Sequence, residues 1–475
     1  MTSIQLRLYH RMPMPLRSVV AGARGWYLRS WRYGPETEEL IASAAARESW
    51  SEAQWHSFRE ERLARVLHRA ATRVPYYRAQ WEARRRAGDR RSPERLEHWP
   101  ILAKETVRAE PSAFLADDVD QRRMYHERTS GTTGTPLDLW LSRQTVRNWF
   151  ALYERRTRGW YGVSRHDAWA MMGGQPVIPP SRRRPPFWVW NAPMHQLYLS
   201  ANHVSARNAA LLVEAIRSRG INHLVTYAST AAALATEAAK LGLGLDGLRV
   251  VITNAEPVFP WQREIIREVF GCPVQETYGM AELVAGAGEC SEGKLHLWPE
   301  VGHVEFLADD ADSPVSAGTA GRLVCTGLLN DDMPLVRFAV GDRGALAAHQ
   351  GCACGRTLPV LSHIEGRTND LIIAPDGRRV YWLNPILYGL PIHQAQIIQE
   401  TLERLRIRYV PAPGFTAAAE REMTERLHQR LGQVHVVFES MESIPREANG
   451  KFKAVRCDLS PGDRERAGLD APARR

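Results

Sequence analysis

One segment of the sequence combines small hydroxyl side chains with glycine in a way that suits an anion. It reads Thr129, Ser130, Gly131, Thr132, Thr133, Gly134, Thr135 and Pro136. Glycine leaves backbone N–H groups free to point at a phosphate, and the hydroxyl groups add further donors. A Walker-type loop is excluded because no Gly-Lys-Ser/Thr follows. Taken alone, such a segment is more often an ordinary polar loop.

Five further motifs follow in a defined order along the chain. They are Asn254-Ala255-Glu256-Pro257, Glu276-Thr277-Tyr278-Gly279-Met280-Ala281-Glu282, Val340-Gly341-Asp342-Arg343, Glu365-Gly366-Arg367-Thr368-Asn369-Asp370 and Asn449-Gly450-Lys451-Phe452-Lys453. Three of them have a plain interpretation when taken singly: Gly341-Asp342 as a turn, Glu282 as a solvated helix residue and Lys451 as a surface cation. All of them together would require a run of coincidences, so their joint presence favours a functional interpretation.

In the order and separation of these motifs, residues from about 60 to 458 resemble the adenylate-forming superfamily of acyl-CoA synthetases, peptide-synthetase adenylation domains and luciferases. The sequence looks most similar to the phenylacetate–CoA ligase branch, including its capsule-biosynthesis relatives. The resemblance implies an ATP- and magnesium-dependent acid–thiol ligase. Such an enzyme activates a carboxylic acid as an acyl adenylate, releases pyrophosphate, and passes the acyl group to coenzyme A or to an acyl carrier protein.

The resemblance also implies how the motifs would bind ATP. The loop Thr129–Gly134 would hold the β- and γ-phosphates. The adenine and ribose would be bound by Ala255, Glu256, Pro257, Tyr278, Asp342 and Arg367. Tyr278 would lie against the base, because an aromatic face supplies stacking area. Asp342 would accept hydrogen bonds from the ribose hydroxyls.

Two residues would carry the chemistry. Glu282 would bind magnesium, a hard cation that prefers carboxylate and phosphate oxygens. Lys451 would reach both the carboxylate of the acid and the α-phosphate of ATP, and so offset the repulsion between two anions that must meet. The small C-terminal domain that carries Lys451 would move about a hinge at Asn369 and Asp370.

The sequence departs from the superfamily pattern at two places. Position 281 is alanine where serine or threonine is usual, and the phosphate loop lacks the lysine that many members have. These departures keep an alternative open, a degenerate relative that binds ATP or an acyl group without turnover, as a scaffold in polysaccharide biosynthesis. The acid itself is not readable. Its pocket is expected to use Gly173–Val177, Tyr227–Ser229 and the neighbourhood of Tyr278.

Four residues have types and spacings that suit a metal ion. Cys290 and His296 form one pair and Cys352 and Cys354 a second. Three thiolates and one imidazole are typical of a closed tetrahedral zinc site. The alternative is that these cysteines are small, reduced core residues.

The elements expected around these motifs predict an α/β protein. Strands near 167–172, 224–227, 250–253 and 274–276 alternate with helices near 206–218, 231–241 and 261–270, which is typical of layered, largely parallel sheets. A mostly helical lead-in over 1–95 and a small β-barrel-like part complete a large N-terminal domain over 1–368. A small, mobile α+β domain follows over 369–460, with a strand near 405–410, a helix over 415–431 and a strand over 434–438. Turns are expected at Gly341-Asp342 and Asp376-Gly377, and a disordered tail over 461–475.

Composition sets the remaining bounds. The formal net charge is +9, and arginine supplies 57 of the 62 basic residues because lysine occurs at only five positions. No stretch interleaves basic and aromatic residues as a single-strand nucleic-acid binder would. No apolar run reaches the roughly 18 residues of a membrane-spanning helix. We therefore expect a cytoplasmic enzyme that binds no nucleic acid, with contact at a membrane surface left open.

Overall fold

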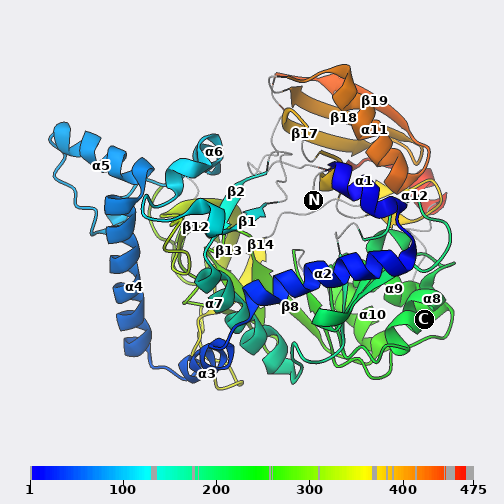
Figure 1. The fold of residues 1–475 in the computed structure, drawn as a ribbon, viewed down its shortest axis with the longest axis horizontal. Helices are drawn as coiled ribbons and strands as arrows, with labels where there is room; N and C mark the ends of the chain where they lie inside the picture. Colours follow the sequence, from blue (N-terminus) through cyan, green and yellow to red (C-terminus); the bar gives the residue numbers. More distant parts are fainter. Residues whose placement is uncertain are drawn as a thin grey trace.

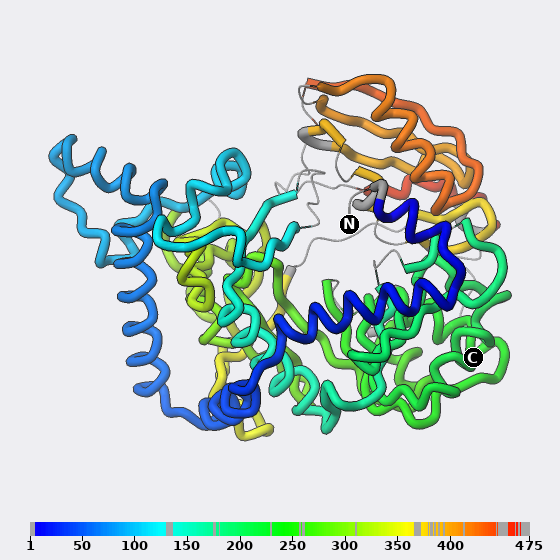
Figure 2. The backbone as a smooth tube through the Cα atoms, viewed as in Figure 1, coloured from blue at the N-terminus to red at the C-terminus, as the bar shows by residue number. Residues whose placement is uncertain are grey.

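The computed structural model describes residues 3–129, 136–173, 177–179, 181–255, 258, 260–308, 311–365, 372–380, 383–387, 390–411, 414–442, 444 and 455–466. It contains a large part built around one long mixed sheet and a smaller part, orange to red, built around a second sheet (Figure 1, Figure 2). The predicted α/β class is confirmed. The exact domain limits stay a prediction.

The N-terminal lead-in is helical, as predicted. Its helices are α1 (Ser3–Arg11), α2 (Met14–Arg32), α3 (Thr37–Arg47), α4 (Glu52–Arg73) and α5 (Pro75–Arg86). Helix α4 begins at a capping box, in which the Ser51 hydroxyl accepts from the Gln54 N–H and the Gln54 side chain accepts from the Ser51 N–H. Pro75 then starts α5, because proline fits the first turn of a helix but not its interior.

The large part is organised around a twelve-stranded sheet with strand order β11-β12-β13-β14-β10-β9-β8-β7-β6-β3-β5-β4. Half of it consists of β3 (Trp169–Gly173), β4 (Trp188–Asn191), β5 (Gln196–Ser200), β6 (His223–Thr226), β7 (Val250–Thr253) and β8 (Val274–Gly279). These strands are parallel except for β4 at the edge. Helices α8 (Ala209–Arg217), α9 (Ala228–Lys240) and α10 (Pro260–Phe270) connect them. The strands and helices predicted between 167 and 276 are confirmed.

The other half of the sheet is antiparallel. It consists of β9 (Gly286–Glu289), β10 (Leu295–Leu297), β11 (Gly302–Leu307), β12 (Gly321–Gly327), β13 (Phe338–Leu346) and β14 (Val360–Glu365). The predicted turn at Gly341-Asp342 is wrong, because both residues lie inside β13. The register of β13 with β12 shifts between Arg322 and Val324, and Gly341 has a φ of +85° there. The shift in register marks a β-bulge, and glycine can adopt a positive φ there without strain.

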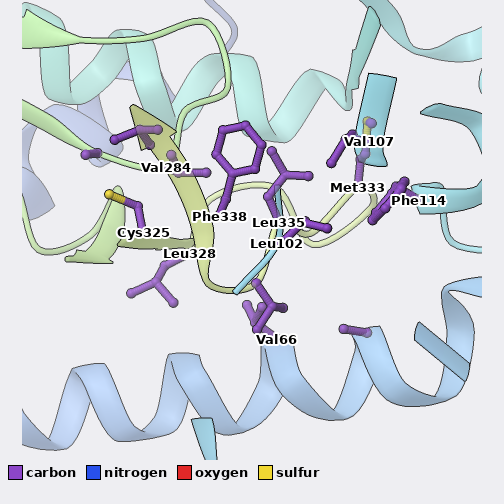
Figure 3. Close-up of a cluster of buried hydrophobic side chains, with 14 of the residues drawn as sticks. Val66, Leu102, Val107, Phe114, Val284, Cys325, Leu328, Met333, Leu335 and Phe338 are labelled. Atoms are coloured by element: carbon purple, nitrogen blue, oxygen red, sulfur yellow. The ribbon is translucent and has the colours of Figure 1, made fainter. Parts of the chain in front are cut away.

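Helix α4 packs on this antiparallel half. In Figure 3, Val66 points from α4 toward Leu102 and Leu335, and Phe338 of β13 lies in the same cluster. All four side chains are buried. Apolar burial of this kind contributes roughly 25 cal/mol per Å² of area removed from water. The lead-in helices therefore hold β13 in place.

A short hairpin precedes the parallel strands in the sequence and forms a separate two-stranded sheet. It consists of β1 (Tyr125–Arg128) and β2 (Asp138–Leu141), with α6 (Lys104–Ala109) before it and α7 (Arg143–Tyr153) after it. The Ser142 hydroxyl accepts a hydrogen bond from the Thr145 N–H and so caps α7.

The smaller part has its own sheet and core. Its elements are β15 (Ile372–Ile373), β16 (Arg379–Val380), β17 (Ile392–Gln399), β18 (Arg404–Pro411), α11 (Ala417–Leu431), β19 (His435–Ser440) and β20 (Val455–Cys457). The predicted strand, helix and strand over 405–438 are confirmed, as is the turn at Asp376-Gly377, which closes β15 on β16. Residues 461–466 differ from the predicted disorder. They form α12 (Pro461–Arg466), in which the Ser460 hydroxyl accepts from the Asp463 N–H.

Candidate active site

A cavity of about 440 Å³ opens where the parallel strands end. Tyr227 directly follows β6, Ala255 lies just beyond the end of β7, and Tyr278 lies near the end of β8. All three residues line the cavity. Ligands of open α/β sheets bind outside the carboxyl ends of their strands. Ala255 also has a φ of +61°, and a left-handed alanine is typical of strained functional loops. The structure thus brings Ala255 and Tyr278 to one cavity, as predicted.

The wall of this cavity is largely aromatic. Its aromatic residues are Trp31, Tyr125, Trp149, Phe150, Tyr153, Trp169, Tyr227, Tyr278 and Trp298. Gly279 and Gly286 leave room for two of them: a Cβ on Gly279 would lie 3.2 Å from the Trp149 ring, and one on Gly286 would lie 3.0 Å from Trp298. Burial raises the pKa of the Glu127 carboxyl in the same wall, as a water-poor cavity would. Such a surface suits a bulky apolar group.

Tyr278 and Asp342 are in direct contact. The Tyr278 hydroxyl donates to Asp342 Oδ2 at 2.8 Å. The bulge at Gly341 places Asp342 in β13 next to a residue that is 64 positions away in the sequence. The residues predicted for the adenine and for the ribose therefore lie side by side.

Glu282 lies in a buried turn after β8, not on a solvated helix. Its Oε1 is 2.5 Å from Nζ of Lys104, and the two side chains are only 5% and 15% exposed. Burial and the nearby charges of Asp342, Glu305 and Glu282 raise the pKa of the Cys325 thiol well above its ordinary value. Asp342 and Glu282 therefore both lie within electrostatic reach of the Cys325 thiol, and carboxylate oxygens are ligands that a magnesium ion prefers.

Of the predicted phosphate loop, the structure describes Thr129, which directly follows β1. Thr129 closes the base of this loop: the Thr129 N–H donates to the Leu137 carbonyl at 3.0 Å, and the Thr129 hydroxyl accepts from the Leu137 N–H at 2.9 Å. Several predicted site residues lie outside the described part of the chain. These are Ser130, Gly131, Thr132, Thr133, Gly134, Glu256, Pro257, Arg367, Asn369, Asp370 and Lys451.

The four predicted metal ligands come together beside β9 and β10. One ligand atom from each of Cys290, His296, Cys352 and Cys354 lies within 4.8 Å of the others. The sulfurs of Cys290 and Cys352 are 3.7 Å apart, and Cys354 Sγ is 3.4 Å from His296 Nε2. Tetrahedral zinc bonds of ordinary length would separate two sulfurs by about 3.8 Å and a sulfur and a nitrogen by about 3.5 Å. The donor set and its spacing therefore fit a zinc ion.

The surroundings of this cluster also suit a metal site. Nδ1 of His296 donates to the Leu358 carbonyl at 3.1 Å, which leaves Nε2 as the ligand atom. Arg356 lies over the Trp160 ring, 4.3 Å from its centroid, and hydrogen-bonds to Glu48 at 3.2 Å. Because Glu48 follows α3, these contacts connect the cluster to the helical lead-in.

Sequence reasoning missed several site residues, and each has a local explanation. Lys104 had one usable signal, since lysine is rare in this chain. Trp149 and Trp298 had no signal, because nothing in the sequence places them next to Gly279 and Gly286. Arg158 lies at the end of a π-helical turn, Glu154–Arg158, which continues α7 into the cavity wall. Such turns are frequent at functional sites, but they have no sequence signature. Conversely, Gly173 and Val177, expected in the acyl pocket, are not among the described residues that line the cavity.

Glu276 beside the site should make stability depend on pH. Burial and the negative charge of Glu289 raise the pKa of the Glu276 carboxyl to about 7, against the opposing effect of Arg263. Between about pH 4.5 and 7 the folded chain holds this proton more tightly than the unfolded chain, so stability falls as pH rises. In the wild type, the free energy of unfolding should fall by on the order of 2 kcal/mol between pH 5 and pH 8, and Glu276→Gln should abolish this fall. Urea unfolding at both pH values measures it.

The exposed Glu264→Gln on α10 is the matched control and should keep the wild-type difference between the two pH values. A Glu276→Gln variant with that same difference would contradict the assignment.

The chain resembles known proteins over most of its length. The family model of the CapK C-terminal domain matches residues 373–458. A phenylacetate-coenzyme A ligase of Thermus thermophilus is 26% identical over 440 residues, which cover 86% of this chain and 94% of that protein. Protein CapK of Staphylococcus aureus is 22% identical over 274 residues, which cover 58% of this chain and 59% of that protein.

A solved structure shares the fold. It is a 2-hydroxyisobutyryl-CoA ligase in complex with 2-HIB-AMP and CoA in the thioesterification state, with a TM-score of 0.56 and 22% identity, covering 87% of this chain and 91% of that one. These relatives and this fold confirm the resemblance drawn from the motifs. In sequence the chain is therefore similar to phenylacetate-coenzyme A ligases and to protein CapK, and it shares the fold of a 2-hydroxyisobutyryl-CoA ligase.

Proposed function

We propose that this chain activates a bulky, apolar carboxylic acid with ATP and magnesium and then transfers the acyl group to the thiol of coenzyme A. The observation that carries the proposal is the aromatic cavity at the ends of β6, β7 and β8, with Ala255 and Tyr278 in its wall. The sequence relatives that are phenylacetate-coenzyme A ligases support the reaction class.

The reaction would proceed in two displacements. In the first, a carboxylate oxygen of the acid bonds to the α-phosphorus of ATP, and the bond from that phosphorus to pyrophosphate breaks. In the second, the sulfur of the thiol bonds to the acyl carbon, AMP leaves with the bonding electrons, and the thiol proton passes to solvent. Both steps develop negative charge, so positioned cations and hydrogen-bond donors lower the barrier.

We assign parts of this reaction to residues that the structure describes. Tyr278 would lie against the adenine, and Asp342, which accepts from the Tyr278 hydroxyl, would turn a carboxylate oxygen toward the ribose. Glu282 would hold magnesium, which would neutralise phosphate charge when bound. The Thr129–Leu137 hydrogen bonds would fix the base of the phosphate loop.

The cavity wall favours aromatic and other bulky apolar acids over small ones. A cavity of about 440 Å³ is in the range that holds a small ligand. Each methylene buried in such a wall contributes about 0.8 kcal/mol, so an aryl acid should gain far more there than acetate does.

Exchange of labelled pyrophosphate into ATP tests the proposal over a panel of aryl acids, fatty acids and acetate. We expect the best bulky acid to exceed acetate by at least about tenfold in kcat/KM. Acetate and an acid-free mixture are the controls. Background exchange with every acid would favour the degenerate relative, for which Ala281 in the cavity wall is the motivating feature.

Variants of the Glu282–Lys104 ion pair distinguish two roles for Glu282, a magnesium ligand and a purely structural carboxylate. We expect Glu282→Gln to weaken the dependence of pyrophosphate exchange on magnesium, because a neutral amide is a poorer ligand than a carboxylate. Lys104→Gln removes the same ion pair but keeps the carboxylate. It should therefore retain the wild-type magnesium midpoint, and magnesium titration of the exchange rate compares the two.

Thermal unfolding of both variants reports the structural cost, because removal of one member of a buried ion pair leaves the other unpaired. Equal shifts of the magnesium midpoint in the two variants would mean that Glu282 acts only through the ion pair.

We also propose that the Cys290, His296, Cys352 and Cys354 cluster binds one structural zinc ion. All four positions would be filled by protein, which leaves no open position for a substrate. The ion would fasten the turn between β9 and β10 to the connection between β13 and β14. Tyr278 is paired with Ala287 of β9, so the metal would stabilise the strand that carries the nucleotide-binding tyrosine.

A further inference from the structure

The first two helices expose most of the large apolar side chains that the described part of the chain leaves in water. Among the described residues, seven large hydrophobic side chains are exposed, and five of them belong to α1 and α2. The five are Leu8, Leu16, Val19, Trp26 and Tyr27. Val19 and Trp26 are 65% and 69% exposed. Single exposed apolar residues are ordinary, but a gathering of this size on one segment calls for a partner.

Helix α2 has two apolar faces. Its inner face buries Ala21, Gly25, Leu28 and Trp31 against the large part. Leu16, Val19, Ala23 and Trp26 recur at spacings of three and four, so they form a second stripe on the opposite side. Figure 1 shows α2 lying across the front of the molecule in this view.

The same segment is strongly cationic. Residues 1–35 contain six arginines and neither aspartate nor glutamate. Arg17 is used internally, because its buried guanidinium donates to the carbonyls of His10 and Met12 and ties α1 to α2. Arg7, Arg11, Arg24 and Arg29 are exposed. Within the described part of the chain, no ion pair joins these four to an acidic side chain.

We propose that α1 and α2 dock on an anionic phospholipid surface, with the outer stripe of α2 in the headgroup region and the exposed arginines on lipid phosphates. An apolar stripe with tryptophan and flanking arginines is the pattern of helices that lie in the plane of a membrane interface. A second copy of the chain fits this face less well, because a two-fold pairing would bring the same arginines together. No helix among the described residues is long and apolar enough to cross a bilayer, so the helices would lie on the surface.

Co-sedimentation of the full chain with vesicles tests this proposal without any assay of activity. We expect binding to vesicles of equal parts phosphatidylglycerol and phosphatidylcholine and little binding to phosphatidylcholine alone. Val19→Ser with Trp26→Ser should weaken the partition coefficient at least about tenfold, since both side chains lose apolar contact. Arg7→Gln with Arg11→Gln should weaken it about fivefold for each arginine removed. Salt near 1 M, where the Debye length is about 3 Å, should weaken it further.

Two matched variants serve as controls. Leu211→Ser with Leu241→Ser removes the other two exposed apolar side chains, and Arg85→Gln with Arg86→Gln removes exposed arginines of α5. Both should bind like the wild type. Circular dichroism checks that every variant is folded, which the exposure of the substituted residues leads us to expect.

Equal binding to neutral and anionic vesicles, or equal loss in the α5 variant, would overturn the proposal. Sedimentation velocity without lipid tests whether a second copy of the chain occupies this face instead. A wild-type dimer that becomes monomeric in the Val19→Ser, Trp26→Ser variant would assign the face to a second copy and overturn the proposal.

Discussion

Replacement of Lys451 by alanine should slow formation of the acyl adenylate by about 10² to 10³, the usual effect of removing one positioned donor from a developing anion. In that step the carboxylate and the α-phosphate must come within bonding distance, and an ammonium group between them stabilises the transition state more than the ground state. In the thioester step the small part would turn and Lys451 would leave. The same variant, given pre-formed acyl adenylate and coenzyme A, should therefore form thioester at close to the wild-type rate. Single-turnover kinetics of each half-reaction measures both.

Lys453→Ala is a matched control, because it removes a lysine two positions away and should leave both half-reactions unchanged. Asp370→Pro tests the proposed hinge and should show the reverse pattern, with adenylation kept and thioester formation lost. If Lys451→Ala slowed both half-reactions equally, the lysine would be structural or the small part would not alternate.

Cys354→Ser should release the zinc ion and lower the free energy of unfolding by several kcal/mol. A closed zinc site contributes its binding free energy to folding, and loss of one of three thiolates removes a large share of it. Elemental analysis of the purified wild type should find about one zinc per chain. Denaturant unfolding of wild type and variant, each with and without a chelator, measures the linked stability.

Cys457→Ser is the control, because this cysteine lies outside the cluster, and a hydroxyl can keep its hydrogen bond to Gln399. It should retain zinc and wild-type stability. Wild-type protein without zinc, together with a Cys354→Ser variant of unchanged stability, would leave the four residues as a reduced core cluster.

The fold was largely predictable because its signals are local. The strands that end near Thr226 and Thr253 are short apolar runs between helical segments, and such alternation predicts a parallel sheet. The turn at Asp376-Gly377 was also predictable, because Asp-Gly is a common turn sequence. The turn predicted at Gly341-Asp342 failed because a glycine with positive φ serves a bulge as well as a turn, and only the pairing partner distinguishes them.

The candidate site was predictable only in part. Motif residues such as Ala255 and Tyr278 could be identified, because each belongs to a motif of residues that are contiguous in the sequence. Lys104 could not, since its partner Glu282 is 178 positions away and the pairing depends on how α6 packs against the turn after β8. The same holds for Trp31 and Trp149, which reach one cavity from separate helices. Contacts between distant segments are set by tertiary packing, which the pattern of a single segment does not contain.

Helix α2 supplies Leu28, Trp31 and Arg32 to the wall of the cavity, although it lies far upstream of every nucleotide-binding motif. Under the proposed function, α2 would contact the acyl group from a stretch of the chain that contains none of the predicted ATP-binding residues. Exchange of residues 14–32 between related proteins would alter which acids fit while the machinery for ATP remained intact. Substitutions in one N-terminal helix would then be a route by which related proteins change the acid that they select.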